Sequence, residues 1–312
     1  MKKIFFAIII LSLNILNLYS FTEKEFFYYA KYGKTDKVLE YINEKNIDPN
    51  MTSEEGYTAL IFAAMGNYDI LAEELIKAGA DPNKTDLYGA TPLMYASIKG
   101  NIAVLKVLLL AKADVNAKDV NNKTALIYSI KYVDVLKILL EAGAHVNVQD
   151  VEGKTALMLA SEKKYEYTAK ILLEAKSNIN AADKYGYTAL MFASIQNANG
   201  IVDMLLNAGA NANIQNNAGQ TALMMAIMTT DLLTVEIFLN YDNVNLNIKD
   251  EDGNTALLLA TSISDRIVSQ LLVEKGADVN VKNKNGWTPL RYARYFDNTV
   301  IEKILLEAGA IQ

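Results

Sequence analysis

The sequence contains no cysteine and a single histidine, His145. Without cysteine the chain forms no disulfide and has neither thiolate ligands for zinc nor a cysteine nucleophile. One histidine does not make a zinc site, and the nucleophile elbow that would accompany a Ser-His-Asp triad is absent from the sequence. We therefore interpret His145, within Gly143–Asn147, as a solvent-facing loop residue.

Positive charge is in deficit. The chain has 30 lysines and arginines against 36 acidic residues, a formal net charge of −6 and an isoelectric point of about 5.1. An acidic chain repels phosphate, which argues against general nucleic-acid binding. With 312 residues, 51% of them hydrophobic, the chain is long enough for two or three compact domains or for one array of repeats.

The first 20 residues have the pattern of a secretory signal peptide. Lys2 and Lys3 precede an apolar run, Ile4–Leu13, and a small residue follows at Ser20. We predict export from a bacterial cytoplasm, so that the mature protein is periplasmic or secreted. The alternative is an uncleaved membrane anchor, for which Ile4–Tyr19 is short because a spanning helix needs about 20 apolar residues.

A phrase of threonine, then alanine or proline, then leucine recurs along the chain. It starts at Thr58, Thr91, Thr124, Thr155, Thr188, Thr221, Thr255 and Thr288. The spacings are 33, 33, 31, 33, 33, 34 and 33 residues. A fixed period in this range is typical of a stacked repeat protein, in which each repeat contacts only its neighbours.

Residues 86–116 illustrate one repeat. Gly89 marks a turn, and Thr91 caps a helix whose first residue, Pro92, has no N–H to leave unsatisfied. A second helix is predicted from about residue 102 to residue 111, with an apolar stripe. Neither helix is long enough to be stable alone, so stacking on the next repeat must bury the stripes.

This pattern resembles the ankyrin repeat. The family's Thr-Pro-Leu-His-x-Ala corresponds to Thr91–Ala96, and its Gly-Ala-Asp-x-Asn corresponds to Gly79–Asn83. The resemblance covers about residues 22–310 and departs from the family at one position, where Met94 and its equivalents replace the histidine.

The resemblance implies an all-α ankyrin-repeat solenoid of about nine helix-turn-helix units, joined by β-turn or hairpin-like loops. We expect a signal peptide at 1–20 and an ankyrin repeat domain at 21–312. Within that domain we expect an N-terminal capping repeat at 21–52, inner repeats at 53–285 and a C-terminal capping repeat at 286–312. The predicted capping repeats are atypical because one side of each faces water.

Some repeats are irregular. The repeat that begins at Thr124 lacks two residues in the turn between its helices, and the repeat that begins at Thr221 gains one near Tyr241. Lys112 and Lys176 replace the glycine that ends the second helix elsewhere. A lysine in a left-handed conformation costs about 1 kcal/mol relative to glycine, so Lys112→Gly and Lys176→Gly should stabilise the protein.

Two apparent ligand motifs fail on inspection. Gly33-Lys34-Thr35 and Gly153-Lys154-Thr155 resemble the end of a phosphate-binding loop, but Tyr28 and Val148 stand where that loop needs its first glycine. The run Asp250–Gly253 resembles a calcium loop, but Ile248 and Leu259 occupy its first and last ligand positions. We predict no cofactor and no metal.

One column of large residues lies at the fifth position of each phrase. Its members are Phe62, Tyr95, Tyr128, Leu159, Phe192, Met225, Leu259 and Tyr292. A column at helical spacing is more often core than a ligand groove, and we interpret it as core.

The turn tips, in contrast, vary freely, and packing within a repeat requires no large aromatic residue there. Tyrosine and tryptophan are enriched in binding hot spots, and the resemblance implies that the tips and the ends of the first helices line a concave, partner-binding face. The predicted protein-binding residues are Tyr57, Tyr88, Ile98, Tyr185, Tyr187, Ile195, Met228, Trp287, Tyr295 and Phe296. The alternative is that these rings only stack on one another, since single exposed apolar residues mean little.

The sequence therefore predicts a non-catalytic scaffold of the cell envelope or exterior that binds a protein partner. We expect no nucleic-acid partner and no small-molecule cofactor, and membrane contact only through an uncleaved signal segment. The alternatives are a secreted effector that acts on host proteins and a purely structural spacer. An enzyme is disfavoured, because no nucleophile–base pair, metal cluster or phosphate cradle is present in the sequence.

Overall fold

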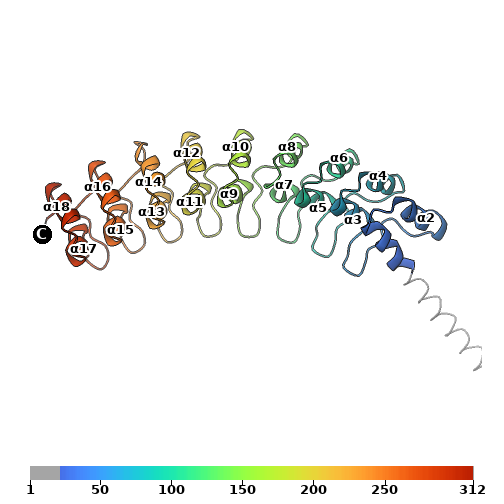
Figure 1. The fold of residues 1–312 in the computed structure, drawn as a ribbon, viewed down its shortest axis with the longest axis horizontal. Coiled ribbons are helices and arrows are strands. Elements are labelled where there is room, and N and C mark those ends of the chain that lie inside the picture. The colour runs from blue at the N-terminus through green and yellow to red at the C-terminus, as the bar shows by residue number, and fades with distance from the viewer. Residues whose placement is uncertain (1–21, 312) are drawn as a thin grey trace, which may run out of the picture. The chain divides into compact units, whose positions relative to one another are not determined.

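The computed structural model describes residues 22–311, and it shows short helices in antiparallel pairs (Figure 1). The predicted all-α architecture is confirmed: the described residues form no strand, and a single isolated antiparallel bridge joins Ala182 to Thr188. The predicted signal peptide, residues 1–20, lies outside the described residues. A search of the described helices finds none with the length and apolar character to cross a membrane.

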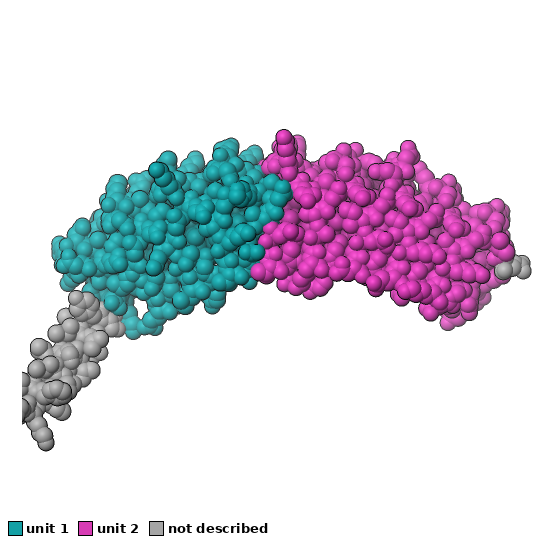
Figure 2. Space-filling model, turned by 180° about the vertical axis from the view of Figure 1, so that it is seen from behind, with its two compact units in different colours: residues 1–148 teal, residues 149–312 magenta. Residues whose placement is uncertain are grey.

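Backbone contacts divide the chain into two compact units, one ending at Val148 and the other beginning at Gln149 (Figure 2). In the first unit, residues 22–31 are helical and are followed by α2 (Thr35–Lys45), α3 (Ala59–Gly66), α4 (Asp69–Lys77), α5 (Pro92–Lys99), α6 (Ile102–Leu110), α7 (Ala125–Tyr128) and α8 (Val133–Glu141). The second unit comprises α9 (Ala156–Glu162), α10 (Glu166–Glu174), α11 (Ala189–Ile195), α12 (Asn199–Asn207), α13 (Ala222–Met228), α14 (Leu232–Leu239), α15 (Ala256–Ser262), α16 (Arg266–Glu274), α17 (Pro289–Tyr295) and α18 (Thr299–Glu307).

Within each unit the pairs stack in sequence order. The first helix of a pair packs on its own second helix and on the first helix of the next pair, as α5 does with α6 and α7, and as α11 does with α12 and α13. In each unit of Figure 1 the first helices form one row, the second helices form another, and the loops extend beyond the first row. Every loop therefore begins on one pair and ends on the next, which keeps neighbouring pairs in contact.

The threonines begin the first helices as predicted. The Thr91 Oγ1 accepts a hydrogen bond from the Met94 N–H (3.3 Å), and Pro92 occupies the first helical position. Leu93 and Ala96 are fully buried on the inner face of α5, and Leu105 is fully buried on the facing side of α6. Burying a leucine of this kind is worth about 2 kcal/mol, so the apolar stripe and the cap together define each pair.

Thr124 is the exception. Its side chain makes no cap to α7, and its buried Oγ1 has no hydrogen-bond partner among the described residues. This repeat is the one whose inter-helix turn lacks two residues, and α7 has only four residues where α5 has eight. The shortened turn thus removes the second half of the first helix. Ser129 caps the C-terminal end of α7, and its Oγ donates to the Leu126 carbonyl (2.8 Å).

The second helices end as the sequence predicts. Lys112 and Lys176 have positive φ angles of 62° and 60°, in the left-handed region, at the position where Gly79, Gly143 and their equivalents have φ near 90°. His145 is exposed in its loop, as expected.

A ladder of asparagines joins successive repeats on the loop side of the second helices. In the first unit the Asn83 Oδ1 accepts from the Asp114 N–H (2.7 Å), and in the second the Asn213 Oδ1 accepts from the Asn245 N–H (2.8 Å). Each such bond spans about one repeat, so it fixes the register between neighbours while leaving the fold of each pair unchanged.

Candidate protein-binding surface

The candidate surface consists of the loops that precede the first helices, together with the exposed faces of those helices; we call it the turn surface. Its loops comprise residues 53–57, 86–90 and 119–123 in the first unit, and 150–154, 183–187, 216–220, 250–254 and 283–287 in the second. In every loop the N–H of the first residue donates to the carbonyl of the fifth, as Asp86 does to Ala90 at 3.1 Å. The predicted hairpin-like loops are therefore present.

A polar side chain at the first position holds each loop closed, and in six of the eight loops this side chain is buried. Asp86 is only 7% exposed, and its Oδ1 accepts from the N–H groups of Tyr88 and Ala90, both at 2.8 Å. Its other oxygen accepts from the hydroxyl of Tyr95 on α5 (2.6 Å). Burial, with the hydrogen bond to Asp86, raises the pKa of Tyr95 above its ordinary value, so the hydroxyl stays a donor through the neutral range.

Adjacent loops are joined by their backbones. In the first unit the Val120 N–H donates to the Tyr88 carbonyl (3.0 Å), and in the second the Asn217 N–H donates to the Tyr185 carbonyl (2.9 Å). Such bonds connect the loops 86–90 and 119–123 in the first unit, and all five loops of the second unit, into rows rather than independent flexible segments. Such a row is a rigid platform, on which side chains are held in position before a partner arrives.

The column at the fifth position of each phrase is not core, and this corrects the prediction. Seven of its eight members are half-buried, and only Met225 is fully buried. The reason is geometric: Leu93 and Ala96 face the second helix, and Tyr95 lies about 200° around the helix from Leu93, at 100° per residue. The column therefore lines the turn surface beneath the loop tips.

The fifth residue of each turn loop, which we call the tip residue, packs on this column in several repeats. Ring centroids are 5.5 Å apart for Tyr57 and Phe62, 5.6 Å for Tyr187 and Phe192, and 4.6 Å for Trp287 and Tyr292. Two loops have lysine at this position: the Lys123 ammonium lies over its own column ring, Tyr128, at 5.9 Å, and the Lys154 ammonium lies over Phe192 of the next repeat at 4.5 Å. In the four pairs within single repeats the partners are five residues apart, a spacing visible in the sequence that periodicity arguments did not use.

The ten predicted binding residues therefore fall into two groups. Five are half-buried: Tyr57, Ile98, Tyr187, Ile195 and Trp287. Five are exposed: Tyr88 (65%), Tyr185 (53%), Met228 (55%), Tyr295 (68%) and Phe296 (47%). The exposed group has the side chains that a partner would reach first.

The structure brings together only some of these residues. In the last repeat the Trp287 and Tyr295 rings are 5.2 Å apart and the Tyr295 and Phe296 rings 5.0 Å apart. Tyr57 instead contacts Tyr95 (5.8 Å), which is outside the predicted set. Tyr88 in the first unit and Tyr185 in the second belong to neither cluster, and each lies on its own loop.

Clusters that could bind a metal are not found in the described part of the chain, where no three His, Asp or Glu side chains gather closely enough. The glycine of the failed phosphate-loop match, Gly153, is the fourth residue of a turn loop with φ of 79°. The carboxylate of Asp250, from the failed calcium match, accepts from the N–H groups of Asp252 and Asn254. Both segments are thus accounted for as turn loops.

Comparison with known protein families agrees with this architecture. A family model described as ankyrin repeats (3 copies) matches residues 26–119, 71–150, 102–183, 132–216, 198–283 and 223–312, in overlapping segments. A search of curated proteins finds no match. The matched segments together span the chain from residue 26 to its last residue, and the chain belongs to the ankyrin repeat family.

Proposed function

We propose that the protein is an exported, non-catalytic scaffold that binds a protein partner through its turn surface. Ankyrin repeats are generally protein–protein interaction modules, and the family is typically non-catalytic. The observation that carries the proposal is the pair of exposed tyrosines, Tyr88 and Tyr185, held on loops whose backbones are hydrogen-bonded to the next loop. Rigid, exposed aromatic residues are the commonest anchors of protein interfaces.

The exposed group supplies the variants for a test. The rings of Tyr57, Tyr187 and Trp287 pack on the column, so removing them would disturb the surface itself. Tyr88→Ala and Tyr185→Ala instead remove side chains that are mostly in solvent, at little cost to stability.

The experiment is chemical cross-linking and affinity capture from the exported fraction, with partners quantified by mass spectrometry. We expect a partner that the wild-type protein captures and that the Tyr88→Ala, Tyr185→Ala double variant loses. The matched control is Tyr167→Ala, because Tyr167 is 78% exposed but lies on the second helix α10, away from the loops. Equal capture by the double variant and the wild type would show that the turn surface is not the binding site.

Export is tested separately. Cells that express the full chain are fractionated, and the N-terminus of the protein in the periplasm or medium is sequenced. We expect it to begin near residue 21, after the predicted signal peptide. An exported protein that still begins at Met1 would refute cleavage.

A further inference from the structure

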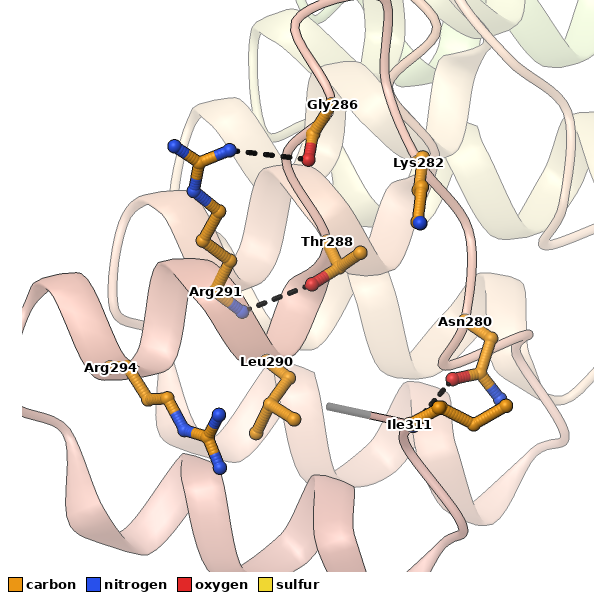
Figure 3. A pocket seen from close by; sticks show the side chains of 8 residues that line it. All are labelled: Asn280, Lys282, Gly286, Thr288, Leu290, Arg291, Arg294 and Ile311. Carbon is orange, nitrogen blue, oxygen red and sulfur yellow. Dashed lines mark hydrogen bonds between the residues drawn. The ribbon is translucent and has the colours of Figure 1, made fainter.

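We propose that the end of the second unit, formed by the last helical pair, binds an acidic peptide segment of the partner. This inference rests on the proposed function, because it names the chemistry of one of its binding sites. A pocket of about 530 Å³ lies there, lined by Asn280, Lys282, Gly286, Thr288, Leu290, Arg291, Arg294 and Ile311 (Figure 3). Its volume is in the range of peptide and ligand sites.

The pocket is basic in an acidic protein. The eight described residues that line it include three cations, Lys282, Arg291 and Arg294, and no carboxylate. Arg294 forms an ion pair with Glu302 (2.7 Å), whereas among the described residues no carboxylate pairs with Lys282 or Arg291. In Figure 3 the side chains of Lys282 and Arg294 extend into the space on either side of Leu290. Lys282 and Arg291 are therefore the lining cations that have no carboxylate partner among the described residues and that an anionic group could meet.

The two arginines occupy positions that are buried in the other repeats of the unit. Residues equivalent to Arg291 are Met158, Met191, Met224 and Leu258, each at most 1% exposed. Residues equivalent to Arg294 are Ser161, Ser194, Ile227 and Thr261, which are also buried. The following repeat covers those positions, and the last pair has no following repeat within the described chain.

Solubility explains a polar end face but not this choice of residues. An end face that no repeat covers within the described chain needs hydrophilic side chains, and lysine or glutamate would provide them. The chain has three arginines among 30 basic residues, and two of the three lie in this pocket. Arginine differs from lysine in presenting a planar fork of donors that fits a carboxylate with two parallel hydrogen bonds. The residue type therefore indicates carboxylate recognition.

Lys282 occupies a position from which side chains reach the next repeat. Gln149 and Gln215 hold the equivalent position and donate to the carbonyls of Ala182 and Lys249, both at 2.9 Å. Lys249 also holds it, and its Nζ donates to the carbonyl of Lys282 at 3.1 Å. In these three repeats the equivalent side chain donates to a chain segment of the next repeat. Lys282 places its ammonium donor at the corresponding position of the last repeat.

The single tryptophan of the chain orders the third cation. The Arg291 guanidinium carbon is 4.4 Å from the centroid of the Trp287 ring, which stacks on Tyr292. The Arg291 Nη1 donates to the Gly286 carbonyl (3.4 Å), and stacking on the ring leaves the remaining edge donors of the guanidinium available for an anion. Ile311 is 73% exposed beside the pocket and offers an apolar contact. An extended segment that alternates carboxylates with aliphatic residues matches this arrangement.

The test is a direct titration with the full-length protein at low salt. The probe is a fluorescein-labelled nonapeptide of alternating glutamate and leucine, and its control is the same peptide with glutamine in place of glutamate. Binding is followed by anisotropy of the label and, independently, by the emission of Trp287. We expect saturable binding of the glutamate peptide and a change in Trp287 emission, and at least tenfold weaker binding of the glutamine peptide.

Single substitutions locate the site. Arg291→Gln and Lys282→Gln should each weaken binding about tenfold, and Arg291→Lys should weaken it less because the charge is kept. The matched control is Arg266→Gln, which removes the same charge from an exposed position on α16, outside the pocket. All these side chains are exposed, and circular dichroism verifies that each variant is folded.

Three results would overturn the inference: equal affinity for the two peptides, equal weakening by Arg266→Gln and Arg291→Gln, or no saturable binding. Self-association of the wild-type chain that Arg291→Gln abolishes would also overturn it, because a second copy would then fill the pocket. Partner capture that depends on Tyr88 and Tyr185 would stand in each of these cases. Failure of the acidic-peptide proposal can therefore be distinguished from failure of the proposed function.

Discussion

Replacing Lys112 and Lys176 by glycine should stabilise the protein. Both residues have left-handed backbone angles, with φ of 62° and 60°, and both side chains are exposed. The left-handed region costs a residue with a Cβ about 1–2 kcal/mol. Replacement by glycine removes this cost, but the greater freedom of glycine in the unfolded chain lowers the free energy of unfolding by about 0.5–1 kcal/mol. The net gain in the free energy of unfolding is therefore about 0.5–1 kcal/mol at each site.

The two gains should add, because the residues belong to different units and lie 64 residues apart in the sequence. The double variant should gain about 1–2 kcal/mol, measured by urea unfolding followed by circular dichroism, and should melt about 2–4 °C higher.

Two controls isolate the backbone effect. Gly143 holds the equivalent position with φ of 89°, and an added Cβ there would meet no atom within 4 Å, so Gly143→Ala should destabilise through backbone strain alone. Lys118→Gly changes an exposed loop lysine that is not left-handed, and it should lower stability. A lower midpoint for both Lys112→Gly and Lys176→Gly would refute the reasoning.

Three further predictions concern single hydrogen-bonded side chains: one in a turn loop, one in the asparagine ladder and one in the first helical pair. Asp86→Ala removes two backbone hydrogen bonds and one tyrosine hydrogen bond, and should lower the free energy of unfolding by about 2–4 kcal/mol in urea; a loss below 1 kcal/mol would contradict this. Asn213→Ala breaks bonds of 2.8 Å to the chain segment 243–245 of the next repeat, and should cost about 1–2 kcal/mol in the same assay, whereas an unchanged midpoint would exclude a role for the ladder. The Tyr41 hydroxyl donates to Glu25, which raises the pKa of Tyr41 to about 12 from its usual 10. This contribution is complete below pH 10 and is lost as pH rises from 10 to 12, so wild-type stability should fall more steeply in that window than that of Tyr41→Phe, and parallel curves would contradict the assignment.

Repeat boundaries, caps and helix pairing follow from the sequence because they depend on short-range chemistry. Thr91 must cap and Pro92 must begin the helix because their backbone requirements are local. The missing turn residues also located the irregular repeat correctly. The sequence did not indicate that Thr124 loses its cap, because that outcome depends on how the four-residue α7 fits against its neighbours.

The exposure of the candidate site was harder to predict. Helical periodicity placed Tyr95 and its equivalents in one column, but it does not show whether the adjacent loop covers that column. The loop covers it only partly, and aromatic or lysine tips such as Tyr57 and Lys123 fill part of the remaining space. Some side chains that the sequence assigned to partner binding, such as Tyr57, therefore pack on the column instead. The number of predicted binding residues overstates the area available to a partner.

The position of the exposed tyrosines has a different basis. Tyr88 and Tyr185 are the third residues of their loops, and their carbonyls accept the hydrogen bond that joins each loop to the next. That bond fixes the backbone, while the side chain makes no contribution to it and remains mostly in solvent. Asn121 and Asn285 hold the same position in other loops, so folding does not require an aromatic ring there. A residue that folding leaves unconstrained can be selected for binding alone, and this is the reason to look for the partner at the third loop position rather than at the fifth.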